Sequence, residues 1–321
     1  FILVFDVVRR ITGHSFFMKY RYPAMLHTMP KNLVIFGGFA IGLILMVSIY
    51  GVLHARRVYV RQDPVVIEKS SSLPGLKIAL IADLHLGYNS TKSHVRKIVD
   101  TINSQNVDLV CIAGDLFDND YNAIKDPDEV ADILSDIKSR YGTYACWGNH
   151  DVSEKILAGF TFPQKETIVR DGRFTEFLHH AGITMLEDET VCINNAFYLV
   201  GRRDKDMAKK EQLPRKTFAE ITEPLDPSLP IIVMDHQPGE LSEASDAGVD
   251  LDLSGHTHDG QMFPANLVVH FLWENACGVL KKGAMTSIVT SGAGVWGPAM
   301  RVGTNNEVVI ANVSFDPATD Q

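Results

Sequence analysis

Short apolar runs rich in β-branched residues recur after residue 76, and each run is followed at once by polar residues that can bind metal ions. The runs have the length and composition of buried strands. They cover residues 78–81, 107–113, 143–147, 231–234 and 251–253. Side chains at the carboxyl ends of successive strands collect along one edge of a sheet, where open α/β sheets bind their ligands. The pattern therefore predicts one polar site assembled from distant parts of the chain.

Helical and further strand patterns fill the spaces between these runs. Residues 91–105 and 127–140 carry apolar side chains at helical spacing, and Thr91 and Asp126 are placed to cap the two helices. Shorter strand-like segments follow at residues 183–186, 190–193, 196–201, 287–290 and 307–313. Helices that alternate with strands, followed by a set of shorter strands, predict an α/β fold in which two sheets pack together with helices outside.

The amino-terminal part has a different pattern. Residues 33–53, from Leu33 to Leu53, contain no charge, and a helix of this length spans roughly 30 Å. This predicts a transmembrane helix rather than a buried core helix, and the run exceeds the apolar region of a signal peptide, which is typically about 7–15 residues long. We expect residues 1–32 to be a basic membrane-proximal segment whose apolar start is the end of an earlier span. Residues 54–75 have the composition of a linker.

Charge is divided unevenly between these parts. Residues 1–70 hold nine Lys or Arg and three Asp or Glu, a net charge of +6, whereas the whole chain carries −9 and residues 71–321 therefore −15. The split predicts a basic segment at a membrane surface and an acidic domain, which disfavours nucleic acid as a ligand. Five basic residues precede the apolar segment and four follow it, which slightly favours an extracytoplasmic domain in a single- or multi-pass protein.

The polar islands after the strands contain aspartate, asparagine and histidine at spacings that suit metal binding. In an extended chain Asp83 and His85 share one face, so both can reach one ion. Gly148 lets the backbone approach closely, so that the amide oxygen of Asn149 can bind a metal. A carboxylate at Asp115 could bridge two ions. The four cysteines lack paired spacing and predict neither a disulfide framework nor a thiolate site. The five islands are Asp83-Leu84-His85, Gly114-Asp115, Gly148-Asn149-His150-Asp151, Asp235-His236 and Gly255-His256-Thr257-His258.

Together the islands resemble the calcineurin-like metallophosphoesterase family, whose pattern is Asp-x-His, Gly-Asp-x-x-Asp, Gly-Asn-His-Asp/Glu, a lone His and Gly-His-x-His. The resemblance covers residues 76–313 and implies a domain over residues 76–321 with a four-layer α-β-β-α sandwich, preceded here by the transmembrane helix. It also implies two divalent metal ions, with manganese favoured over iron or zinc. The implied ligands are Asp83, His85 and His258 for the first ion, Asn149, His236 and His256 for the second, and Asp115 as the bridge.

The resemblance also implies a catalytic pair. His150 resembles the family's catalytic histidine, which binds no metal, and Asp118 would orient its ring and favour the imidazolium form. Two cations would clamp the phosphate and activate a bridging water to hydroxide, while His150 protonates the leaving group or steadies the transition state. Outside this context His150 would be a polar loop histidine and Asp118 a solvated turn carboxylate. Asp151 is expected either to support the metal loop or to cap a helix.

A finer likeness is to the membrane-associated bacterial branch of the family. It rests on residues 255–261 with Pro264, and on residues 292–298 followed by Arg301. The branch often has Gly where this chain has Asp259, which lies beside two implied ligands. Arg301 is expected either to contact phosphate or to lie on the surface.

A dense apolar stretch follows the last island, at residues 262–263 and 267–273. It is expected to be either a core helix or a lid beside the metals that faces the membrane. A lid would suit a lipid-linked substrate, so a metal-dependent phosphodiesterase or pyrophosphohydrolase acting on a lipid-linked or cell-envelope phosphoester is the first hypothesis. A phosphomonoesterase or protein phosphatase, and a catalytically silent metal-binding membrane receptor, are the alternatives.

Overall fold

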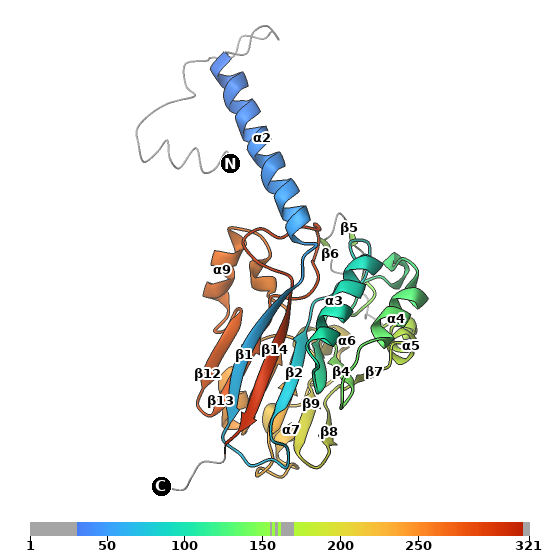
Figure 1. The fold of residues 1–321 in the computed structure, drawn as a ribbon, viewed down its shortest axis with the longest axis vertical. Helices are drawn as coiled ribbons and strands as arrows, with labels where there is room; N and C mark the ends of the chain where they lie inside the picture. Colours follow the sequence, from blue (N-terminus) through green and yellow to red (C-terminus); the bar gives the residue numbers. More distant parts are fainter. Residues whose placement is uncertain (1–30, 155, 158–159, 162–169, 317–321) are drawn as a thin grey trace. The chain divides into compact units, whose positions relative to one another are not determined.

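The computed structural model describes residues 31–154, 156–157, 160–161 and 170–316 (Figure 1). It divides into two units, Phe1–Met46 and Val47–Gln321. The expectations for residues 1–32 lie almost wholly outside the described residues.

The apolar amino-terminal segment forms helix α2 (Lys31–His54), which begins in the first unit and ends in the second. Within the described residues it is the one helix long and apolar enough to cross a membrane, over Ile35–His54. Most of its apolar side chains are exposed, so it is not the core helix of a soluble domain.

The first sheet of the second unit holds three of the five predicted strands. In spatial order it contains β1 (Tyr59–Ile67), β14 (Glu307–Phe315), β2 (Leu76–Ile81), β3 (Leu109–Ala113), β4 (Thr143–Cys146) and β7 (Ile183–Met185). The inner strands β2, β3 and β4 run parallel, with β7 beyond β4, and β14 pairs antiparallel with β2 on the other side.

Strand β1 corrects the expectation of a linker over residues 54–75. It pairs in parallel with β14 over nine residues. Its side chains alternate between exposed and buried positions, with Asp63, Val65 and Ile67 facing inward. Pro64 and the neighbouring Asp and Glu residues obscured this period-two pattern, although Pro is tolerated on an edge strand because one side of that strand needs no hydrogen-bond donor.

The second sheet holds the other two predicted strands, β10 and β11, side by side and parallel. Buried side chains of the two sheets pack against each other in one cluster that includes Ile78, Leu109, Ile232 and Leu253. In spatial order the sheet contains β12 (Gly278–Lys282), β13 (Met285–Val289), β11 (Leu251–Ser254), β10 (Ile231–Met234), β9 (Phe197–Gly201) and β8 (Glu189–Ile193).

Helices cover the outer face of each sheet and complete the predicted four-layer sandwich. Helices α3 (Lys92–Ser104), α4 (Pro127–Ser135) and α5 (Gly172–His180) lie together outside the first sheet (Figure 1). Helices α7 (Phe218–Thr222) and α8 (Leu241–Asp246) pack on the second sheet through a separate apolar cluster. The predicted fold class is therefore confirmed.

The helix ends follow the predictions in part. The Thr91 side chain accepts a hydrogen bond from the backbone of His94 and caps α3 as predicted. Asp126 stands at the N-cap position of α4 as predicted, but its side chain makes no capping hydrogen bond, because the residue is left-handed (φ 54°) and its carboxylate bonds Lys92 instead. Helix α4 also ends at Ser135, earlier than the apolar spacing predicted.

Candidate metal centre

All five polar islands follow the ends of strands, as the sequence predicted. Strands β2, β3 and β4 bring three islands from the first sheet, and β10 and β11 bring two from the second. Because the two sheets pack face to face, the islands meet at one shared rim. Backbone hydrogen bonds join them directly: Asp83 N donates to Gly114 O, and Gly255 N donates to His236 O.

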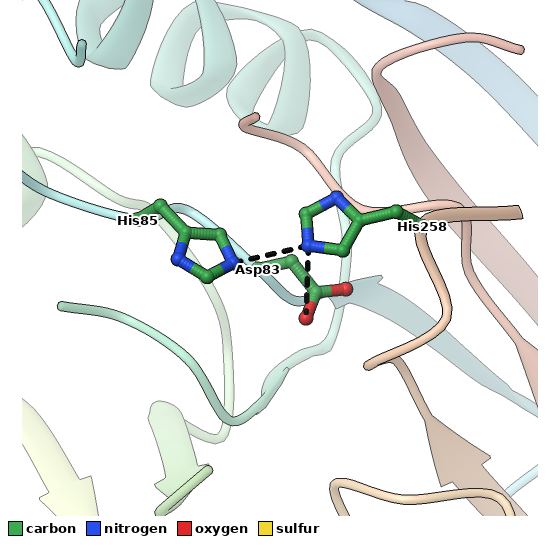
Figure 2. Close-up of side chains that lie close together, drawn as sticks. All are labelled: Asp83, His85 and His258. Carbon is green, nitrogen blue, oxygen red and sulfur yellow. Dashed lines mark hydrogen bonds and ion pairs between the residues drawn. The ribbon is translucent and has the colours of Figure 1, made fainter. Parts of the chain in front are cut away.

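One group of side chains contains Asp83, His85 and His258 (Figure 2). The Nε2 atoms of His85 and His258 lie 3.0 Å apart, and His258 Nε2 lies 3.8 Å from an Asp83 carboxylate oxygen. All three side chains are buried. His258 is 173 positions from His85, yet the nitrogen and oxygen atoms of the three side chains point at one spot.

A second group contains Asp115, His236 and His256, with Asn149 beside it. His236 Nε2 lies 3.1 Å from Asp115 Oδ2, 3.0 Å from Asn149 Oδ1 and 3.2 Å from His256 Nδ1. Asp115 Oδ2 also lies 3.8 Å from His85 Nε2, so this carboxylate stands between the two groups. The seven implied ligands therefore form two clusters, and the Asp115 carboxylate of the second stands next to His85 of the first.

The chain reaches this geometry through backbone turns rather than through extended strands. Asp83, His85, Asp115, His256 and His258 all have positive φ, between 45° and 72°. The expectation that Asp83 and His85 converge because they share one face of an extended chain is therefore wrong. Left-handed residues other than glycine are strained by about 1–3 kcal/mol each and persist where surrounding contacts fix them, which is common at functional sites.

The arrangement around His236 fits a divalent cation. His236 Nδ1 lies 2.8 Å from the carbonyl oxygen of Ala113, which can only accept, so Nδ1 carries a proton. The other ring nitrogen faces a carboxylate oxygen and an amide oxygen. Burial would lower the pKa of His236, but Asp115 outweighs it and raises that pKa well above the ordinary value. The positive charge favoured at this point is what a bound metal ion would supply.

Burial prepares the remaining groups as ligands. It lowers the pKa of His256 to about 3 and, together with His85, holds the pKa of His258 well below its ordinary value. Burial raises the pKa of Asp83 to about 6. It would also raise the pKa of Asp115, but His236 and His150 outweigh it and keep that pKa well below the ordinary range. His256 and His258 thus offer neutral imidazoles beside the ionised Asp115 carboxylate, whereas the pKa of His85, like that of His236, is raised by neighbouring carboxylates that outweigh burial.

Two residues hold the metal-binding loops together. A Cβ on Gly148 would collide with the carboxylate and backbone nitrogen of Asp115, so only glycine allows this approach. The buried Asp151 carboxylate accepts hydrogen bonds from the backbone nitrogens of Asp115, Phe117 and Gly148, at 3.0, 2.8 and 2.7 Å. Asp151 therefore supports the metal loops, and the alternative of a helix cap is not what its contacts show.

His150 has a different partner from the one predicted. Its Nδ1 is hydrogen-bonded to Oδ1 of Asn119, whose side chain is fully buried. Asp118 lies with His85 and His150 in one cluster, and its carboxylate is 3.6 Å from His85 Nδ1. Burial lowers the pKa of His150 to about 4, so the ring is neutral at pH 7. A neutral amide orients the ring, whereas the sequence predicted a carboxylate that favours imidazolium.

The orientation of Asn119 is itself determined by neighbouring charges. Its Nδ2 donates to the Glu154 carboxylate at 3.1 Å, so its oxygen must face His150 and His150 Nδ1 must carry the proton. Lys210, on α6 (Lys205–Glu211), donates to the same carboxylate and to the carbonyl of Asn149, both at 3.0 Å. Reasoning from sequence missed Asn119, Glu154 and Lys210, because none stands in a motif and they meet only in the fold.

Arg301 neither lies on the surface nor is placed to contact phosphate. It is fully buried, and its guanidinium donates to Asn306 Oδ1 at 2.7 Å and to the carbonyls of His258, Ser291 and Gly294 at 3.0, 2.6 and 2.7 Å. Both expectations for this residue are therefore wrong. Arg301 fixes the backbone of the loop that carries His258.

The remaining island residue, Asp235, faces away from the two clusters. Its carboxylate accepts hydrogen bonds from Arg202 at 3.0 Å and from Arg215 at 2.6 Å. It anchors the end of β10 next to His236. The Asp235 carboxylate is buried, so removing both arginines together would leave it as an unpaired buried charge.

The apolar stretch after the last island forms helix α9 (Ala265–Leu272), which is not a core helix. Only Val269 within it is buried, and Phe271 is 90% exposed. The helix is held to the site by a 3.0 Å bond between His270 Nε2 and the Asp259 carboxylate. The Trp273 ring, directly after α9, stands edge-on to the His256 ring with centroids 5.3 Å apart.

The four-layer fold and the two clusters of nitrogen and oxygen ligands are those of a metal-dependent phosphoesterase. Residues 76–260 match the family model described as calcineurin-like phosphoesterase, and the chain belongs to this family. Membership implies a phosphoester hydrolase that uses divalent metal ions. The apolar helix and relatives named as transmembrane proteins suggest association with a membrane.

Curated relatives share the domain but are longer than the matched region. A protein of Helicobacter pylori named uncharacterized metallophosphoesterase is 32% identical over 251 residues, which are 78% of this chain and 62% of that protein. The transmembrane protein with metallophosphoesterase domain of Danio rerio is 28% identical over 285 residues, 82% of this chain and 59% of that protein. UDP-2,3-diacylglucosamine pyrophosphatase LpxG of Chlamydia muridarum is 24% identical over 228 residues, 61% of this chain and 67% of that protein. The chain therefore spans about 60% of the length of the first two.

Proposed function

We propose that the protein is a membrane-bound phosphodiesterase or pyrophosphohydrolase that depends on two divalent metal ions and acts on a lipid-linked or cell-envelope phosphoester. The observation that carries the proposal is the convergence of seven ligand side chains into two clusters with Asp115 between them, next to the exposed apolar helix α9. The catalytic domain covers residues 76–321, with β1 added to its first sheet, and lies on the extracytoplasmic side.

The residues divide between the two ions as the clusters do. Both ions are bound through nitrogen and oxygen, which suits manganese, iron or zinc, and manganese is our choice. Two such ions, when bound, draw charge from phosphate oxygens and lower the pKa of coordinated water. Asp83, His85 and His258 would hold one ion, Asn149, His236 and His256 would hold the other, and Asp115 would serve both.

His150 handles the proton of the leaving group. Its Nδ1 proton is directed to Asn119, so Nε2 is the atom free to act. In the neutral ring Nε2 has a lone pair, and the negative charge of an arriving phosphate raises the pKa of the ring so that Nε2 takes up a proton. His150 then donates this proton to the departing oxygen. Asp118, in the same cluster as His85 and His150, favours the charged ring electrostatically.

The substrate class follows from the surroundings of the clusters. Trp273 lies against His256, and the Trp296 ring lies 6.1 Å from the His150 ring. One aromatic ring beside the second cluster and one beside His150 provide apolar surface near the site, which suits a lipid tail better than a charged peptide. LpxG, whose name gives it a diacylated sugar nucleotide as substrate, is similar over 61% of the chain.

Two alternatives remain to be separated by experiment. A phosphomonoesterase or protein phosphatase would use the same clusters, and a silent membrane receptor would bind metal without turnover. The full chain, purified in detergent, should be stripped of metal and reloaded in turn with manganese, iron and zinc. Its turnover is then measured on bis-p-nitrophenyl phosphate, p-nitrophenyl phosphate, a phosphorylated peptide and a diacylated sugar-nucleotide pyrophosphate.

We expect metal-dependent turnover with the highest kcat/KM on the lipid-linked pyrophosphate. Asn149→Ala should abolish turnover of every substrate, whereas Asn122→Ala, an exposed asparagine outside the site, should not change it. Preference for the monoester or the phosphopeptide would favour the phosphatase. Metal-loaded protein that is inactive on all four substrates would support the receptor.

A further inference from the structure

We propose that the exposed apolar face of α9 inserts into the lipid bilayer in which the protein is anchored, at the level where headgroups meet acyl chains. This rests on the proposed membrane anchoring by α2 and deepens the proposed function, since it would place the metal centre at the membrane surface. The surface consists of Phe263, Leu267, Val268, Phe271 and Leu272, and we call it the α9 face.

The α9 face is apolar on one side and fastened on the other. From Gly260 to Trp273 the chain contains no Asp, Glu, Lys or Arg. All five side chains of the α9 face are more than half exposed, and Phe271 and Leu272 are exposed to 90% and 73%. Val269 is buried, and His270 bonds Asp259. Large apolar side chains gathered on one face of a helix mark a binding surface rather than ordinary exposure.

Contacts within the second unit connect the α9 face to the end of the candidate membrane span. The backbone nitrogen of Arg301 donates to the carbonyl of Gly51, in the last turns of α2, at 3.0 Å. The next residue, Val302, bridges to Met262 and accepts a hydrogen bond from Phe263 N at 2.8 Å. Phe263 is the first side chain of the α9 face. The end of the span and the start of the face are therefore joined through residues 301–302.

A bilayer fits this surface better than a protein partner. The face consists of protruding aromatic and aliphatic side chains on one short helix and on Phe263 just before it, which is the form of an interfacial anchor, and continuity with the candidate span would hold the face at the membrane. A specific protein partner needs polar groups placed around an apolar centre. Within this face neither charged side chains nor amides are present.

The depth of the α9 face can be measured without any substrate. A nitroxide label is placed at position 271 in the full chain carrying Phe271→Cys and Cys192→Ser, reconstituted in a phosphatidylcholine and phosphatidylglycerol bilayer. The native exposed Cys192, on β8 of the second sheet, provides the matched control label. Cys111 and Cys146 are buried, and burial raises the pKa of the Cys277 thiol to about 12, so these three react poorly near neutral pH.

We expect the label at position 271 to collide mainly with oxygen and to lie about 5–10 Å below the headgroups. The label at Cys192 should collide mainly with an aqueous nickel complex. Equal nickel accessibility at the two positions would overturn the proposal. If the label at position 271 collides with neither oxygen nor the nickel complex, and its spectrum shows broadening that dilution with unlabelled protein removes, a second copy of the chain covers the face. That result would also overturn the proposal. If both kinds of collision are lost in detergent as well as in the bilayer, another segment of this chain covers the face, and the proposal is overturned.

These outcomes are separate from those of the activity test. A label that is deep in the bilayer on an enzyme that ignores lipid substrates would overturn the substrate proposal and leave the α9 face assigned. An enzyme that hydrolyses lipid substrates while the label at position 271 lies in water would overturn the assignment of the α9 face and leave the substrate proposal in place.

Discussion

Replacing Arg301 by methionine should destabilise the domain and weaken metal binding, because its guanidinium bonds the backbone of the implied ligand His258 and lies 3.3 Å from the Nδ1 atom of that residue. Its guanidinium donates to four acceptors, the carbonyls of His258, Ser291 and Gly294 and the side chain of Asn306. The side chain is fully buried, so methionine would fill most of the volume but satisfy none of these groups.

The size of the expected loss in stability follows from the hydrogen-bond acceptors that the substitution leaves without a donor. Each buried acceptor without a donor costs about 1–3 kcal/mol. Four of them would cost more than single substitutions usually do, but the variant no longer buries a charge, and water can reach some of the carbonyls. We therefore expect a loss of about 4 kcal/mol in the free energy of unfolding. Arg301→Lys keeps the charge without the planar fork, so about half of that loss is expected.

Urea unfolding of the full chain in detergent with a chelator measures this loss, and competition with a chelating dye measures metal affinity. We expect metal affinity to fall about 10–100-fold for Arg301→Met, as for other residues that position a ligand. Arg96→Met is the matched control, because Arg96 pairs with Asp136 at the surface and such a pair contributes about 0–1 kcal/mol. If Arg301→Met unfolds within about 1 kcal/mol of the unmodified protein, the reasoning is refuted.

Three further substitutions test other parts of the structure. Burial raises the pKa of Asp252 to about 7. Between about pH 4 and pH 7 the folded chain therefore keeps a proton on Asp252 that the unfolded chain has released, and the free energy of unfolding falls across that window as the pH rises. Asp252→Asn should therefore gain stability over the unmodified protein, on the order of 1–4 kcal/mol by pH 8, and parallel unfolding curves from pH 4 to 8 would contradict this. Gly148→Ala should abolish metal binding, measured as bound metal per chain, whereas Gly172→Ala, with open space around it, should not. Asn119→Ala should slow hydrolysis of an alkyl diester about 10–100-fold, and slow a p-nitrophenyl diester much less because p-nitrophenolate leaves without a proton; equal losses would exclude His150 as the acid.

The strands and the composition of the site could be predicted because both depend on local order. Each of the five apolar runs became a strand that ends next to its polar island. Strand ends in a packed sheet must lie at its rim, so the islands had to meet once the sheets formed. The pairing of Asp83 with His258, 175 residues away, needed only that rule and the family pattern.

The residues that could not be predicted depend on contacts between distant segments. Arginine is rarely fully buried, and nothing in the sequence announces that the carbonyl of His258, 43 residues away, and three nearer acceptors all face the guanidinium of Arg301. Asn119 lies beside the predicted Asp118, and which of the two faces His150 depends on Glu154 and on the turn between them. Helix α9 has the apolar content of a core helix, because composition does not reveal whether an apolar face meets protein or lipid.

The physical domain also begins earlier than the family match. That match starts at residue 76, yet β1 covers the edge of β14 from Tyr59 onward, and Asn306 Nδ2 donates to the carbonyl of Ala55. Asn306 is the same residue that accepts from Arg301, which in turn bonds the carbonyl of His258. The end of α2 is thus joined to a metal-binding loop through Asn306 and Arg301, and only four residues separate α2 from β1. The proposal of a substrate at the membrane rests on this short connection as well as on the α9 face.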